Sequence, residues 1–276
     1  MKSATLLIRT KNEEQSLGAT LEAVFAQSVP PHEVLVIDSG SRDRTLFLAA
    51  RWPVNIIEIT PKGWSYPRAL NVGAREATGE FLVCLSAHCP PIHEEWLANL
   101  LRHFDDESIA GTWGPSVRRW SSVTTNGPTV RQEPGSYTFA TRQWGLNNCN
   151  SALRRSLWLE FPFDEALPAT EDKAWGMEAM ARGYSLVYDP AAAVWHERHP
   201  ATHSFRRAKA VMAGYRMLFP EVHHSMGEEL RKVARMIRRG LVSSARSRDF
   251  RTLLGNCKKL VSVIMALLGK FMAPRA

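Results

Sequence analysis

The first 90 residues alternate between short apolar runs and segments with helical spacing, and this alternation restricts the possible folds more than any other feature. The strand-like runs lie at residues 5–9, 33–37, 55–59 and 79–85. The helix-like segments between them lie at residues 13–27, 45–51 and 68–78. Alternation of this kind, with continuously apolar strands, is typical of a parallel sheet buried between two layers of helices. The sequence therefore predicts an α/β domain with a mostly parallel sheet flanked by helices.

The remaining elements are expected from local signals. Asn12 is placed to cap the helix at 13–27, because asparagine accepts hydrogen bonds from the free N–H groups of a first helical turn. Another helix is expected at residues 171–182, and Gly183 is placed to end it. Residues 112–145 are rich in Gly, Ser, Thr, Pro and Trp, and this composition predicts loops with short strands.

The formal net charge of +8 is distributed unevenly along the 276 residues. Residues 206–276 hold 16 Lys and Arg against 4 Asp and Glu, a balance of +12, which leaves −4 for residues 1–205. Residues 226–241 place apolar side chains on one helical stripe among basic ones. Helices of this kind bind anionic membrane surfaces, although the stripe could instead pack against the first domain. We expect a domain at 1–205 and a basic amphipathic helical extension at 206–276 that binds an anionic membrane.

Other features bear on the compartment and on excluded partners. No stretch reaches the roughly 18–20 apolar residues of a membrane-spanning helix, and residues 1–4 lead directly into an apolar run rather than a signal peptide. The four cysteines lack the spacing of a disulfide framework. No known nucleic-acid-binding module accompanies the basic charge, so we expect no nucleic acid as a partner. We expect a cytoplasmic protein on the inner face of the plasma membrane.

Polar side chains follow three of the predicted strands, where an open α/β sheet binds its ligands. Thr10, Asn12 and Glu14 follow the first strand, Asp38 the second, and Ser86 the strand at 79–85. A carboxylate at such a position can accept hydrogen bonds from a nucleoside base or ribose. The first strand–helix turn contains neither a P-loop nor a GxGxxG sequence, so bound phosphates would need a metal ion or basic side chains. This disfavours P-loop enzymes and dehydrogenases.

Several short motifs, in order along the chain, resemble those of family-two glycosyltransferases of the GT-A fold. They are IRTKNEE at 8–14, VIDSGSRDRT at 36–45, RALNVG at 68–73, ATGEFLVCL at 77–85, TED at 170–172, GY at 183–184 and VWH at 194–196. The resemblance spans residues 4–200 and is strongest to bacterial enzymes of cell-surface polysaccharide synthesis. It implies an inverting transferase that moves a sugar from a nucleoside-diphosphate sugar to a hydroxyl group of a glycan or lipid-linked acceptor.

The resemblance also implies roles for individual residues. Donor-nucleotide contacts would come from Thr10, Asn12, Glu14, Asp38, Arg68 and Ser86. Asp172 would be the general base that takes the acceptor proton. Glu171 and Trp175, in the same predicted helix, are assigned to the acceptor side. His88 and His196 would bind a divalent metal ion.

One motif departs from the family pattern. The DxD metal motif falls on Ser86-Ala87-His88, so both carboxylates are missing. Histidine ligands without carboxylates favour Mn²⁺ over Mg²⁺, which prefers oxygen. Three outcomes stay open: a weakly metal-dependent enzyme, a metal-independent one that uses Arg68, or a non-catalytic scaffold that binds sugar nucleotides.

A metal-dependent hydrolase of nucleotide sugars is a further alternative. The sequence at 196–199 is HExH rather than the HExxH that places two zinc ligands on one helical face. His88, Cys89 and His93 likewise lack a second matching pair of ligands. The sequence alone therefore does not favour a zinc hydrolase.

Overall fold

The computed structural model describes residues 2–60, 62, 64–117, 125, 127–138, 140–141, 145–196 and 201–220. The chain divides into two compact units, which are described separately. One comprises Met1–Ala166 with Glu171–Glu197, and the other comprises Leu167–Thr170 with Arg198–Ala276.

The first unit is built on an eight-stranded sheet with the order β3-β2-β1-β4-β8-β5-β9-β7. The strands are β1 (Ala4–Thr10), β2 (Glu33–Asp38), β3 (Asn55–Glu58), β4 (Phe81–Ser86), β5 (Ile109–Trp113), β7 (Val130–Gln132), β8 (Asn150–Arg154) and β9 (Ser185–Tyr188). Only β8 and β7 run antiparallel to their neighbours. A small second sheet pairs β6 (Ser116–Val117) with β10 (Val194–Trp195). The predicted α/β class is confirmed, but the sheet is mixed: four of its neighbouring strand pairs are parallel and three are antiparallel.

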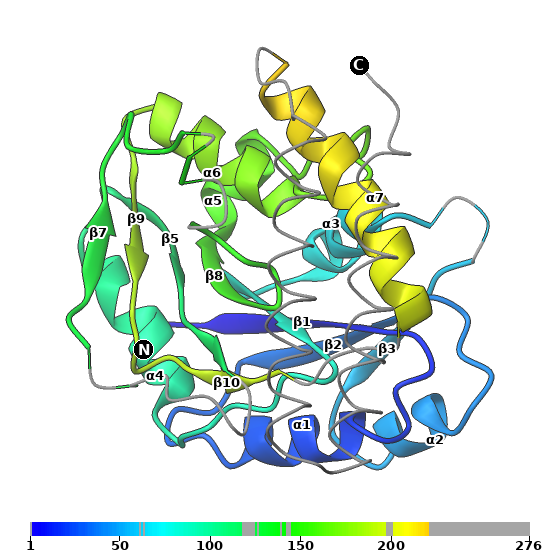
Figure 1. Ribbon diagram of the computed structural model, residues 1–276. Coiled ribbons are helices and arrows are strands. Elements are labelled where there is room, and N and C mark those ends of the chain that lie inside the picture. The colour runs from blue at the N-terminus through cyan, green and yellow to red at the C-terminus, as the bar shows by residue number, and fades with distance from the viewer. Residues whose placement is uncertain are drawn as a thin grey trace, which may run out of the picture. The chain divides into compact units, whose positions relative to one another are not determined.

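Helices cover both faces of the large sheet (Figure 1). They are α1 (Leu17–Phe25), α2 (Thr45–Ala49), α3 (Tyr66–Glu76), α4 (Trp96–Leu101), the 3-10 turn η1 (Arg102–Asp105), α5 (Arg155–Glu160) and α6 (Glu171–Ala181). Strand side chains alternate between two apolar cores: Leu6 and Ile8 of β1 pack with α1 and α4, whereas Leu7 packs with α3. This is the alternation of a strand buried on both faces. The flanking helix layers follow from it.

The start of α1 differs from the prediction. The helix begins at Leu17 after Ser16, four residues later than expected, and Asn12 does not cap it. Asn12 has a φ of 56°, and its side-chain oxygen accepts a hydrogen bond from the backbone N–H of Arg42 at 2.8 Å. The reason is tertiary: the polar side chains of this segment bond to the loop after β2 instead of to a helix end. Gly183, with a φ of 91°, ends α6 as predicted.

The described part of the second unit contains α7 (Ala201–Leu218), which begins before the boundary predicted at residue 205. Residues 221–276, with most of the predicted basic extension, lie outside the described residues. Within the described ranges, no helix combines the length and the apolar character needed to cross a membrane.

Candidate active site

The carboxyl ends of β1, β2 and β4 meet at one edge of the sheet. In the parallel register Thr10 lies beside Asp38, and Arg9 lies beside Ser86. The structure therefore brings Thr10, Asp38 and Ser86 together, as the parallel arrangement requires. Arg68, another predicted donor contact, is exposed in the first turn of α3, where its backbone N–H donates to Ser65 Oγ at 3.3 Å.

Asp38 is fully buried and holds the loop that follows β2. Its Oδ1 accepts hydrogen bonds from the hydroxyls of Thr10 and Ser41, and its Oδ2 accepts from the backbone N–H groups of Gly40 and Ser41 at 2.9 and 2.8 Å. These four donors fill the usual acceptor positions of a carboxylate. The observed contacts of Asp38 are thus internal, and its contact with a base stays a prediction.

Asn12 and Glu14 are exposed and connect the loop after β1 to the loop after β2. Besides the bond from Arg42 to Asn12, Glu14 Oε2 accepts from the backbone N–H of Arg44 at 3.0 Å. Asp43 Oδ2 in turn accepts from the backbone N–H of Glu14 at 3.1 Å. Each loop therefore caps backbone donors of the other. Asn12 and Glu14 thus lie in a loop that is hydrogen-bonded to the loop after β2 at the sheet edge.

A pair of carboxylates, Glu171 and Asp172, begins α6. Asp172 Oδ2 accepts from the backbone N–H of Asn148 at 3.2 Å, and Glu171 Oε1 accepts from the side-chain amide of the same residue at 3.2 Å. Glu171 Oε1 also lies 3.6 Å from a guanidinium nitrogen of Arg9. Since Arg9 is next to the last residue of β1, this ion pair places the start of α6 at the edge where β1, β2 and β4 end.

The two carboxylates have different environments. Glu171 is buried whereas Asp172 is half-buried. Burial raises the pKa of Glu171, the adjacent Asp172 raises it further, and Arg9 opposes both effects. Burial lowers the pKa of Lys173, whose ammonium group donates to the carbonyls of Gly145 and Leu146. Asp172 is thus the more accessible of the two carboxylates, and its neighbours hold it in place.

Two residues have an unusual backbone conformation. Among the described residues, Asn12 and Thr170 are the non-glycine residues with positive φ, at 56° and 73°. Such conformations are uncommon outside glycine and cluster at functional sites. One lies in the loop after β1 and the other directly precedes Glu171.

Trp175, assigned to the acceptor side from the sequence, lies inside the fold. Its side chain is 2% exposed and stacks on Phe161, with ring centroids 5.1 Å apart. Trp175 follows Glu171 by four residues, so both lie on the inner face of α6. The indole therefore packs in the core and presents no surface to an acceptor. Glu171, also assigned to the acceptor side, is likewise buried, with 5% of its surface exposed.

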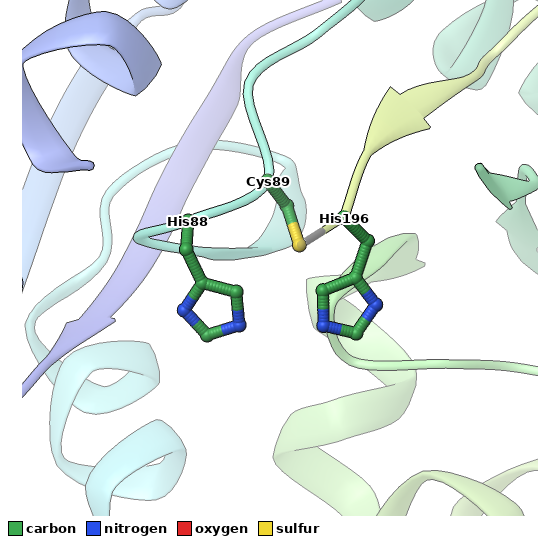
Figure 2. Close-up of side chains that lie close together, drawn as sticks. All are labelled: His88, Cys89 and His196. Atoms are coloured by element: carbon green, nitrogen blue, oxygen red, sulfur yellow. The ribbon is translucent and has the colours of Figure 1, made fainter. Parts of the chain in front are cut away.

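His88 and His196, the two predicted metal ligands, come together with Cys89 (Figure 2). One potential ligand atom from each of the three residues lies within 4.8 Å of the others. The two imidazole rings stack with centroids 5.2 Å apart, and Figure 2 shows one nitrogen of each ring turned toward the other ring. The donors are two imidazole nitrogens and one sulfur, which suit a borderline divalent cation better than they suit Mg²⁺ or Mn²⁺.

Four residues of the site escaped prediction from the sequence. Arg9 pairs with Glu171, Asn148 bonds both carboxylates of α6, Cys89 joins the two histidines, and Glu13 Oε1 lies 2.9 Å from His88 Nδ1. Arg9 and Glu13 lie within the IRTKNEE motif, which was a detectable signal. The roles of Asn148 and Cys89 depend on contacts between distant segments, which no local pattern reveals.

Comparison with known proteins identifies the family. The family model described as Glycosyl transferase family 2 matches residues 5–158. The glycosyltransferase AglE of Haloferax volcanii is 28% identical over 200 residues, which cover 67% of this chain and 63% of that protein. The poly-β-1,6-N-acetyl-D-glucosamine synthase of Staphylococcus aureus is 23% identical over 206 residues, which cover 71% and 50%. This chain therefore spans between half and two thirds of the length of these relatives.

Solved structures share the fold. A mannosyltransferase of Pyrobaculum calidifontis, PcManGT, in complex with GDP-Man and Mn²⁺, superposes with a TM-score of 0.65 at 16% identity, over 98% of this chain and 87% of that one. S. aureus TarS 1-349 in complex with UDP superposes with a TM-score of 0.60 at 15% identity, over 98% and 90%. The fold is GT-A, and the family model covers more than half of the chain. The chain belongs to glycosyl transferase family 2.

Proposed function

We propose that the protein transfers a sugar, with inversion, from a nucleoside-diphosphate sugar to a hydroxyl acceptor at the carboxyl edge of the sheet. The observation that carries the proposal is the ion pair between Arg9 and Glu171, because it places the Glu171–Asp172 pair beside the predicted nucleotide loops. Family membership supports it, as do the GDP-Man, UDP and UDP-GlcNAc in the complexes of structural relatives.

In this proposal Asp172 is the general base. Its carboxylate takes the proton of the acceptor hydroxyl while the hydroxyl oxygen attacks the anomeric carbon. The attack comes from the face opposite the diphosphate, so the bond to the leaving oxygen breaks as the new glycosidic bond forms and the configuration inverts. The backbone N–H groups of Asn148 and Lys173, at 3.2 and 2.8 Å from the Asp172 oxygens, hold the carboxylate in one orientation.

The donor would lie along the paired loops after β1 and β2. Thr10, Asn12, Glu14, Asp38 and Ser86 would form the nucleoside side of this site. Arg68, exposed at the start of α3, would approach the diphosphate. A divalent cation held by His88 and His196 would neutralise charge on the departing diphosphate. Mn²⁺ is the ion in the PcManGT complex and was favoured over Mg²⁺ from the sequence.

We place the acceptor among polysaccharide or lipid-linked glycans, which the name of the S. aureus synthase supports. The basic residues of 206–276 would hold the enzyme against an anionic membrane from the cytoplasmic side.

Replacement of Asp172 by asparagine tests the function. Asp172→Asn cannot accept the proton, and kcat should fall about 10²–10⁴-fold while donor affinity is retained. Glu178→Gln is the matched control, because Glu178 is an exposed carboxylate in the same helix. Donors are first identified by thermal shift with nucleoside-diphosphate sugars. Turnover is then followed as sugar incorporated into a lipid-linked or polysaccharide acceptor.

The outcomes separate the alternatives. A wild-type chain that binds donor but never transfers sugar is a scaffold. A chain that releases free sugar at the same rate with and without acceptor is a hydrolase. An Asp172→Asn variant with unchanged turnover removes Asp172 from the mechanism.

A further inference from the structure

We propose that Cys89 completes a three-ligand site with His88 and His196, and that this site selects a Zn²⁺-like ion over Mn²⁺ and Mg²⁺. The inference deepens the proposed function. Only one part of it rests on that function, namely the role of the ion in the departure of the diphosphate. Binding of the ion by these side chains is independent of sugar transfer. The thiol was not among the ligands expected from the sequence, and it changes the class of metal that the site fits.

The backbone builds the cluster from two distant segments. Ser86 to Cys89 form a turn, closed by a hydrogen bond from the backbone N–H of Cys89 to the Ser86 carbonyl at 3.0 Å. The following residues run beside β10, with hydrogen bonds from Trp195 N–H to the Pro90 carbonyl at 2.9 Å and from Ile92 N–H to the Ala193 carbonyl at 3.0 Å. This pairing brings residue 89 and residue 196 to the same place.

His196 is fixed independently. Its backbone N–H donates to the Val117 carbonyl at 2.7 Å, which continues the pairing of β10 with β6. Cys89 is fully buried in the apolar core, whereas both histidines are half-buried. The sulfur therefore forms a rigid base, and the two imidazoles, which are nearer to solvent, have room to adjust around an ion.

The distances suit a site that closes on its ion. Ligand atoms about 2.0–2.3 Å from a tetrahedral Zn²⁺ lie about 3.5 Å from one another. The three candidate atoms lie within 4.8 Å of one another, so closure requires shifts of about 1 Å, which side-chain rotation of the histidines can supply. Three protein ligands leave a fourth position for an oxygen of the substrate, as in catalytic rather than structural zinc sites.

A carboxylate contacts the imidazole ring of His88. Glu13 Oε1 lies 2.9 Å from His88 Nδ1, and the backbone N–H of Glu13 donates to Thr45 Oγ1 at 2.7 Å. A carboxylate in this position receives the Nδ1 proton and leaves Nε2 as the ligand atom. Zinc-binding histidines are commonly oriented by such a partner. The contact between Glu13 and His88 is therefore of the kind that orients a metal-binding histidine.

The donor set decides which ion fits. Imidazole and thiolate suit Zn²⁺ and neighbouring transition metals, whereas Mg²⁺ and Mn²⁺ prefer carboxylate, carbonyl and water oxygens. Among the described residues, the group that could hold an ion contains no carboxylate. Both the loss of the two DxD carboxylates and the presence of Cys89 reduce the affinity of the site for ions that prefer oxygen ligands. We therefore infer nitrogen and sulfur ligation in place of oxygen ligation.

Co²⁺ substitution provides a test that does not depend on activity. The full chain is stripped with a chelator and titrated with Co²⁺, whose thiolate complexes show a charge-transfer band in the near ultraviolet. We expect one equivalent to bind with this band, Zn²⁺ to displace it, and a roughly 100-fold excess of Mn²⁺ or Mg²⁺ not to displace it. Cys89→Ser should lose the band and weaken Zn²⁺ binding by more than the roughly 10–100-fold that loss of an outer-shell partner costs.

Cys84→Ser is the matched control, because Cys84 is also fully buried but packs in the other core, with α3. It should keep both the band and the affinity. His196→Gln provides a second variant if Cys89→Ser does not fold, and it should weaken Zn²⁺ binding by a similar factor. Tight Zn²⁺ binding by Cys89→Ser with the band intact, or Mn²⁺ displacing Zn²⁺ at equal concentration, overturns the proposal.

The test separates this inference from the proposed function. A chain that binds Zn²⁺ through Cys89 but transfers no sugar contradicts only the transferase proposal. A chain that transfers sugar with Mn²⁺ and shows no thiolate band contradicts only the zinc site.

Discussion

Replacement of Asp38 tests whether this residue holds the nucleotide loops together. Its carboxylate is fully buried and accepts four hydrogen bonds, two from hydroxyls on Oδ1 and two from backbone N–H groups on Oδ2. In Asp38→Asn the amide oxygen can stay opposite the two backbone donors. The amide nitrogen then faces the hydroxyls of Thr10 and Ser41, which can accept as well as donate. In Asp38→Ala both backbone donors lose their acceptor.

The expected losses of stability follow from these contacts. Hydrogen bonds to a charged acceptor contribute about 1 kcal/mol more than neutral ones. Removal of the buried charge offsets part of this loss, so the free energy of unfolding of Asp38→Asn should fall by about 2 kcal/mol. The N–H groups of the half-buried Gly40 and Ser41 each cost about 1–3 kcal/mol when left without an acceptor, so Asp38→Ala should lose about 4 kcal/mol. The alanine variant should therefore be clearly the less stable of the two.

Urea unfolding followed by circular dichroism measures these differences. Asp105→Asn is the control, because the Asp105 side chain is 86% exposed and its one ion pair within the described part of the chain is with Lys2. Its loss should stay within about 0.5 kcal/mol. Equal losses for the asparagine and alanine variants, or an asparagine variant as stable as the control, would refute the role given to the buried carboxylate.

Two further predictions concern the acidic pair of α6 and the basic extension. Burial, and then Asp172, raise the pKa of Glu171, so the stability that its protonated form contributes is complete below its ordinary pKa and is lost as pH rises through the raised value. Wild type should therefore lose stability relative to Glu171→Gln as pH rises across that interval, and parallel urea midpoints at all pH values would contradict this. Deletion of residues 226–276 should release the protein from anionic vesicles, since about 1 kcal/mol of attraction per basic residue is lost; equal recovery of both forms with sedimented vesicles would argue against membrane binding.

Local patterns were sufficient for the elements of the sheet. The expected strands at 5–9, 33–37 and 79–85 correspond to β1, β2 and β4 within two residues. Their apolar runs are continuous because helices cover both faces of the sheet. The sequence pattern of these strands therefore matches their burial. The antiparallel strands β8 and β7 were not predicted as such, because strand direction depends on pairing between segments far apart in sequence. The Asn150 to Arg154 segment carries no local sign of its antiparallel partners.

The site was predictable where sheet geometry determines it and not where side chains are shared between segments. Thr10, Asp38 and Ser86 follow parallel neighbours, so their convergence was foreseeable. The burial of Trp175 was not foreseen, because it follows Glu171 by four residues on the same face of α6 and the burial of Glu171 depends on Arg9 and Asn148. Cys89 was set aside because His88, Cys89 and His93 lack a second matching pair of ligands in the sequence, whereas in the structure His196 lies beside Cys89.

The hydrogen bonds of the loops also limit how a donor can bind. The oxygens of Asp38 are filled by Thr10, Gly40 and Ser41, so a base could reach this carboxylate only if one of those donors moved away. Asn12 and Glu14 are exposed, and one side-chain oxygen of each accepts a hydrogen bond from the neighbouring loop. Recognition that uses the exposed pair leaves the loops intact, whereas recognition by Asp38 opens them. A donor that contacts Asp38 would therefore bind with a conformational cost, and one that contacts Asn12 and Glu14 would find its site already formed.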